Sequence, residues 1–143
     1  MLSSDIALIG TTIHRVAHLI QQRIDSEIGD SGLTRLSWMA AAHLEDSHGL
    51  TITDLAGRLE VGRATAGQLV ERMVQGGWVK RSPSPDDRRL QIVTATPRAK
   101  AVLEDLAPRQ SALEDEILQD LSADERRILL ALLERIRARL GRQ

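Results

Sequence analysis

Four polar side chains near the middle of the chain have the spacing and chemistry to bind a nucleic acid. They are Arg63, Thr65, Gln68 and Arg72. Thr65, Gln68 and Arg72 follow one another in steps of three and four residues, which place side chains on one side of a helix, and Arg63 precedes them in the turn before that helix. Arginine and glutamine can form paired hydrogen bonds with base edges in the major groove of B-DNA, which is wide enough to admit a helix. This face therefore favours recognition of double-stranded DNA.

A second basic group follows in the stretch Arg81–Val93, whose letters are RSPSPDDRRLQIV. Its prolines, serines and aspartates predict a stiff loop between two short strands, which we expect at residues 78–81 and 90–94. Such a hairpin would lie beside the helix and reach a neighbouring groove or the DNA backbone. We expect the basic residues of the hairpin to bind DNA together with those of the helix. They are Lys80, Arg81, Arg88 and Arg89.

The charge distribution supports this interpretation better than the net charge of −1 does. Residues 50–100 carry nine basic and five acidic side chains, whereas residues 1–49 carry three and six. Residues 101–143 carry seven basic and nine acidic side chains. A basic centre between acidic ends is informative about a nucleic-acid partner even when the total is close to zero.

The elements that must position these residues form a winged helix-turn-helix pattern. Thr53 is expected to cap a short helix that ends at Glu60, and a turn at residues 61–63 leads into a helix at residues 64–75. Glycines 76 and 77 end that helix. Leu55, Leu59 and Leu69 would brace the two helices against each other, so that the polar face of the second helix points outward.

Long amphipathic helices flank this unit. We expect them at residues 4–28, at 97–119 and after a capping box that starts at Ser122, and a further helix capped by Thr34 completes the set. Pro108 should kink or split the helix in which it lies. The predicted fold is mainly α with a small β-hairpin wing, divided into a helical dimerisation region (1–32 and 97–143) and a DNA-binding lobe (33–96).

The aliphatic stripes of the first and last helices favour a two-fold homodimer over a monomer in which they pack only on each other. A two-fold protein recognises a pseudo-palindromic operator with half-sites about 10 bp apart. The arginines of the last helix have acids nearby, so we interpret them as a solvated or subunit-bridging face.

Other functional classes have weak support. The chain has no cysteine, which excludes thiolate metal sites and cysteine nucleophiles, and no catalytic constellation or cofactor motif appears, so we expect no enzyme. No apolar segment is long enough for a membrane span and no signal peptide is evident, so we expect a cytoplasmic protein. His14 and His18 are four residues apart and could hold a metal in a metal-responsive regulator. A winged-helix module that binds protein is the other alternative.

Residues 50–103 resemble the MarR family of bacterial transcription regulators, most specifically in the wing residues Asp87-Arg88-Arg89. The resemblance implies a dimeric, ligand-responsive repressor. It also implies that Arg89 enters the minor groove, that Arg88 lies near the backbone, and that Asp87 braces the wing by pairing with Arg72. Trp78 would anchor the hairpin base.

The same resemblance implies a pocket for a small anionic or aromatic effector between the first two helices and the winged lobe. Its candidate lining residues are His14, His18, Trp38, Met39 and His43, with Arg15 or Arg63 as anion partners. The chain departs from the family pattern at Gly62, Ala64 and Gly67, where side chains that cap the helix or contact DNA are common. We expect these departures to change which DNA sequence the chain prefers, and not whether it binds DNA.

Overall fold

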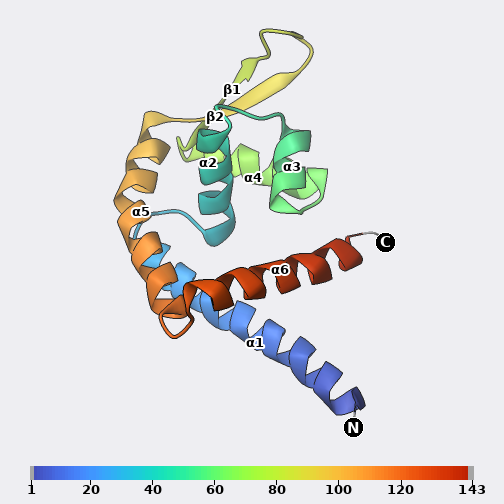
Figure 1. The fold of residues 1–143 in the computed structure, drawn as a ribbon. Helices are drawn as coiled ribbons and strands as arrows, with labels where there is room; N and C mark the ends of the chain where they lie inside the picture. The colour runs from blue at the N-terminus through green and yellow to red at the C-terminus, as the bar shows by residue number, and fades with distance from the viewer. Residues whose placement is uncertain (1, 142–143) are drawn as a thin grey trace. The chain divides into compact units, whose positions relative to one another are not determined.

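The computed structural model describes residues 2–141, with side-chain surroundings from residue 7 onward. In this part of the chain there are six helices, of which four precede a two-stranded hairpin and two follow it (Figure 1). The elements are α1 (Leu2–Ile28), α2 (Arg35–Asp46), α3 (Ile52–Leu59), α4 (Arg63–Gln75), β1 (Val79–Pro83), β2 (Gln91–Ala95), α5 (Pro97–Leu118) and α6 (Ala123–Leu140). The predicted class, mainly α with a small β-hairpin wing, is confirmed.

The chain forms two compact units, which divide within α5 between Arg109 and Gln110. The core of the first unit lies where α2, α3, α4 and β2 meet, and its most deeply buried side chains include Leu44, Leu55, Val70 and Val93. As predicted, Leu55, Leu59 and Leu69 are buried between α3 and α4. The hairpin projects beyond these helices (Figure 1).

Local capping chemistry sets the starts of α2 and α3. Thr34 caps α2 as predicted, and its side chain and that of Ser37 form a reciprocal capping box. The prediction that Thr53 caps α3 is wrong, because the Thr51 side chain accepts from the Asp54 N–H and α3 begins at Ile52. Leu50 pairs with Val93 as an isolated bridge, so the chain passes from a strand contact to the helix within one residue.

The hairpin, which we call the wing together with its loop at residues 84–90, is antiparallel. Its register runs from Val79 opposite Ala95 to Pro83 opposite Gln91. The loop is closed by the Ser84 N–H donating to the Leu90 carbonyl and the Leu90 N–H donating to the Asp87 carbonyl. The first strand begins at Val79 and ends at Pro83, whereas the sequence predicted residues 78–81.

Helix α5 does not split at Pro108, contrary to one form of the prediction. Proline removes the hydrogen bond to the carbonyl four residues earlier, here that of Glu104. Both Glu104 and Pro108 are exposed, so water can bind the carbonyl that lost its partner. The helix can therefore continue to Leu118.

The second unit begins with the end of α5 and contains α6. Ser122 and Glu125 form the predicted capping box at the start of α6. Arg126 donates hydrogen bonds to the carbonyls of Leu118 and Leu121, which closes the turn before α6. No helix in residues 2–141 is both long and apolar enough to cross a membrane.

Candidate nucleic-acid interface

Helix α4 has one buried side and one exposed polar side. Ala66, Leu69, Val70 and Met73 face the core. The four residues singled out from the sequence, Arg63, Thr65, Gln68 and Arg72, are all exposed. Its N-cap, Gly62, makes no side-chain hydrogen bond, as its lack of a side chain predicts. The first turn therefore keeps backbone N–H groups that an anion can approach.

The end of α4 is defined by a tight backbone motif. The Trp78 N–H donates to the Met73 carbonyl at 2.9 Å, and the Gly77 N–H donates to the Val74 carbonyl at 3.0 Å. This is the Schellman pattern, and Gly77 takes the left-handed conformation that it needs, with φ of 74°. Trp78 follows directly and is buried against the core, so the base of the wing is joined closely to α4.

One ion pair links the wing to the side of α4. Arg81 on β1 donates to Glu71 on α4 at 3.0 Å. Its side chain is only about one-third exposed (35%), and its guanidinium is directed to a protein carboxylate. This pair holds the strand beside the helix, whereas Lys80 on the same strand is exposed. Sequence reasoning did not predict this contact, because the partners are ten residues apart on different elements.

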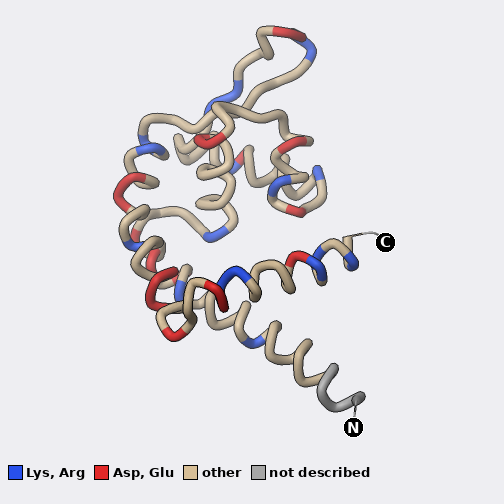
Figure 2. The backbone as a smooth tube through the Cα atoms, viewed as in Figure 1, with Lys and Arg blue, Asp and Glu red and all other residues tan. Residues whose placement is uncertain are grey.

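The tip of the wing carries a second pairing of opposite charges. The Asp87 carboxylate accepts from the backbone N–H of Arg89 at 3.0 Å and from its Nε and Nη2 at 3.1 and 3.3 Å. These bonds lower the pKa of Asp87, the side-chain bond from Arg89 being the largest cause. The Arg89 side chain is nevertheless 90% exposed, and Arg88 beside it is exposed as well. Figure 2 shows basic residues at the base and tip of the wing, next to acidic residues at the tip.

The expected pairing of Asp87 with Arg72 is therefore wrong for this structure. The carboxylate binds Arg89, two residues further on, instead of reaching α4. The physical reason is the short separation in sequence. In a turn, an aspartate can accept a hydrogen bond from the backbone N–H two residues further on, and the residue there, Arg89, also brings its guanidinium within reach. Asp87 therefore stabilises the tip itself and does not connect the tip to α4.

Two of the five candidate effector residues, His14 and His18, line one depression. A depression of about 390 Å³ on α1 is lined by His14, Arg15, His18 and Leu19. Trp38 and Met39 pack against the core and His43 is half-buried, and none of the three lines this depression. Among the described residues no group of three or more His, Asp or Glu side chains is placed to hold a metal ion.

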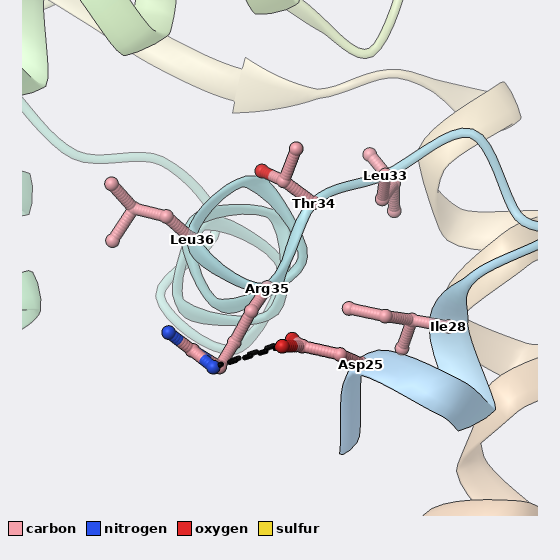
Figure 3. A pocket seen from close by; sticks show the side chains of 6 residues that line it. All are labelled: Asp25, Ile28, Leu33, Thr34, Arg35 and Leu36. Atoms are coloured by element: carbon pink, nitrogen blue, oxygen red, sulfur yellow. Dashed lines mark hydrogen bonds and ion pairs between the residues drawn. The ribbon is translucent and has the colours of Figure 1, made fainter. Parts of the chain in front are cut away.

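A second cavity, of about 430 Å³, lies where the end of α1 meets the start of α2 (Figure 3). It is lined by Asp25, Ile28, Leu33, Thr34, Arg35 and Leu36. Arg35 and Asp25 form an ion pair of 3.2 Å at its edge, with side chains 36% and 55% exposed. Sequence reasoning missed this cavity because no periodicity joins two side chains on helices separated by a turn.

Comparison with known proteins identifies the chain's relatives. Residues 31–90 match the model of the MarR family. The chain is 25% identical over 136 residues to the multiple antibiotic resistance protein MarR of Salmonella typhimurium, covering 94% of both chains. It is 30% identical over 117 residues to the transcriptional activatory protein BadR of Rhodopseudomonas palustris, covering 79% of this chain and 67% of that protein.

The chain belongs to the MarR family. Its members are transcription regulators that bind DNA through a winged helix, so this MarR-family chain is a DNA-binding regulator and not an enzyme. A mutant of MarR from Escherichia coli in complex with operator DNA superposes with a TM-score of 0.84 at 25% identity, over 95% of this chain and 98% of that one.

Two further solved structures agree in fold. A probable transcriptional regulator from Pseudomonas aeruginosa has a TM-score of 0.78 at 28% identity, covering 90% and 96% of the two chains. BpsR from Bordetella bronchiseptica has a TM-score of 0.79 at 24% identity, covering 90% and 91%. We call α4 the recognition helix below, because it is the second helix of the helix-turn-helix.

Proposed function

We propose that this MarR-family chain is a homodimeric repressor that binds a pseudo-palindromic operator in the cytoplasm and releases it when a small molecule binds. The observation that carries the proposal is the exposed polar face of the recognition helix beside a wing whose terminal arginine is 90% exposed. A related protein, MarR of E. coli, has been crystallised with operator DNA.

The roles of the single residues follow from their positions. Thr65 and Gln68 would contact bases or phosphates in the major groove, with Arg63 and Arg72 beside them on the same helix. Arg89 would enter the minor groove, and the other basic wing residues would contact the backbone. They are Lys80, Arg81 and Arg88. For Arg81 this requires that the guanidinium leave Glu71 or serve both groups.

Dimerisation is supported by exposed apolar residues on α1 and on α6. On α1 the exposed apolar residues are Leu8, Ile9, Ile13, Val16 and Leu19. On α6 they are Ile128, Leu129, Leu130, Leu132, Leu133, Ile136 and Leu140. Exposed apolar patches of this extent mark interaction sites. A second copy of the chain is the partner that would also supply the second recognition helix for a two-fold operator.

Light scattering combined with size-exclusion chromatography tests the dimer. The double variant Leu133→Asp and Ile136→Asp introduces charges at positions that are 39% and 43% exposed in the single chain. It should therefore remain folded but become monomeric. Arg139→Ala on the same helix is the matched control and should stay dimeric. A wild-type chain that elutes as a monomer at micromolar concentration would refute this part of the proposal.

The effector is proposed to be a small anion or aromatic acid. The cavity between α1 and α2 offers Arg35, whose present partner Asp25 is exposed enough to be displaced. DNA binding by BpsR, which shares this fold, is regulated by 6-hydroxynicotinic acid, an aromatic acid that serves as a probe. The depression beside His14 and His18 is the alternative site. A ligand releases DNA only by binding the two states unequally.

DNA binding and repression need separate assays. A duplex selected by the wild-type chain from a random pool should be bound with an affinity that falls steeply with salt, because phosphate contacts release counterions. Affinity that is independent of salt would favour a protein-binding module instead. In transcription in vitro from a promoter that contains the selected site, added protein should lower transcript yield. A rise would indicate activation, the role that the name of BadR describes.

A further inference from the structure

Arg98, in the first turn of α5, contacts both the end of the recognition helix and the start of the wing. Its Nη1 donates a hydrogen bond to the carbonyl of Gly76, the C-cap of α4. Its guanidinium carbon lies 3.9 Å from the ring centroid of Trp78, well within the range of a cation–π contact. A single side chain thus contacts the C-cap residue of α4 and Trp78, whose N–H forms part of the Schellman motif.

Thr96, two residues before Arg98, also binds this segment. Its hydroxyl donates to the Gly77 carbonyl at 2.6 Å, and its N–H donates to the Trp78 carbonyl at 3.0 Å. The three consecutive carbonyls of residues 76–78 therefore all accept hydrogen bonds from residues 96–98. Carbonyl groups at the end of a helix lack partners within the helix, and a cation there also interacts favourably with the helix dipole.

We propose that Arg98 is a positioning residue for DNA binding, which sets the direction of the recognition helix relative to the wing without itself touching DNA. The two elements that carry the DNA-contacting side chains meet at residues 76–78, and Arg98 holds this junction from outside. Gly76 and Gly77 have no side chains with which to hold it. The inference rests on DNA binding by the recognition helix and adds a residue outside the proposed interface.

The chemistry of the contact requires arginine and not simply a positive charge. A planar guanidinium can stack on an indole and donate a hydrogen bond at its edge at the same time. A lysine keeps the charge, but its ammonium group cannot do both in one plane. The competing explanation is that Arg98, which is exposed, contacts a DNA phosphate directly. The two explanations differ in how binding depends on salt.

The test compares Arg98→Ala and Arg98→Lys with Lys100→Ala, which removes the same charge two residues further along α5. Lys100 pairs with Glu45 at 3.7 Å, away from the junction. The probe is a labelled duplex selected by the wild-type chain, titrated at several salt concentrations. We expect both Arg98 variants to bind about tenfold more weakly with an unchanged salt slope, and the Lys100 variant to bind within about twofold of wild type.

A second measurement needs no DNA. In a Trp38→Phe background, Trp78 is the single tryptophan, and its fluorescence should change in Arg98→Ala because the stacked cation is lost. Unchanged emission overturns the contact itself, even if the chain binds no DNA. Wild-type affinity in Arg98→Ala, full affinity in Arg98→Lys, or a salt slope reduced by about one would each overturn the positioning role.

Discussion

Replacing Arg89 by alanine removes a highly exposed cation at the tip of the wing. The side chain is 90% exposed, and its Nε and Nη2 donate to Asp87 of the same loop. An exposed side chain contributes little packing, so the Arg89→Ala chain should fold like the wild type. Any loss of DNA affinity therefore reports on the contact that Arg89 makes in the complex.

The expected magnitude follows from the kind of contact. A well-placed arginine–base contact is worth about 1–3 kcal/mol, which corresponds to roughly 5- to 150-fold in affinity. Arg89 must release its side-chain bonds to Asp87 before it enters a groove, which reduces the net gain. We therefore expect a loss near the lower end, about tenfold at moderate salt. If one phosphate contact is also lost, the salt slope should fall by about 0.9.

Fluorescence anisotropy with a selected duplex, repeated across a series of salt concentrations, measures both quantities. Arg139→Ala is the matched control, because it removes the same charge from an exposed position on α6. Binding by Arg89→Ala within about twofold of wild type, with the same salt slope, would refute the minor-groove role. An equal loss in the control would show that only net charge matters.

Further predictions concern the wing tip, base recognition and the end of the recognition helix. Asp87→Ala should weaken DNA binding, because the Arg89 N–H loses the acceptor that shapes the tip; tighter binding would mean that the aspartate only repels DNA. Its lowered pKa means that the tip contact is present at neutral pH and is lost as the pH falls through that depressed value, and an NMR titration with an ordinary aspartate pKa would contradict this. Gln68→Ala should change the sequence selected from a random pool more than the total affinity; an identical selection would exclude base recognition. Gly77→Ala places a side chain at φ of 74° and should cost about 1–2 kcal/mol, lowering Tm by roughly 3–8 °C, whereas Gly57→Ala, with open space around it, should not lower Tm.

Local signals in the sequence were sufficient for the helix-turn-helix. Apolar residues three and four apart predicted which sides of α3 and α4 are buried, and Leu55, Leu59 and Leu69 confirm it. Capping at Thr34 and Ser122 was predictable because the acceptor and the backbone N–H lie within one turn. The error at Thr53 has a local origin, because Thr51 and Thr53 are two residues apart and both could cap the start of α3. Leu50 pairs with Val93, and Thr51, the next residue, is the cap.

Contacts between distant residues could not be predicted in the same way. Arg81 with Glu71, Arg35 with Asp25, and Arg98 with residues 76–78 join side chains from different elements. Long charged side chains can reach many partners, and the differences in energy between exposed pairs are small. Sequence spacing therefore does not select one pair. The error over Asp87 has this origin, because a nearby partner in its own loop competed with one on the recognition helix.

The sequence by itself determined the family, the order of the helices and strands, and the polar side of the recognition helix, because each depends on residue type and short-range periodicity. The tertiary structure alone decided where the arginines are directed. Arg89 lies at the exposed tip with Asp87, Arg81 is held by Glu71, and Arg98 lies at the junction of helix and wing. A charged side chain acquires its role from the groups within a few ångströms of it, and folding sets those distances.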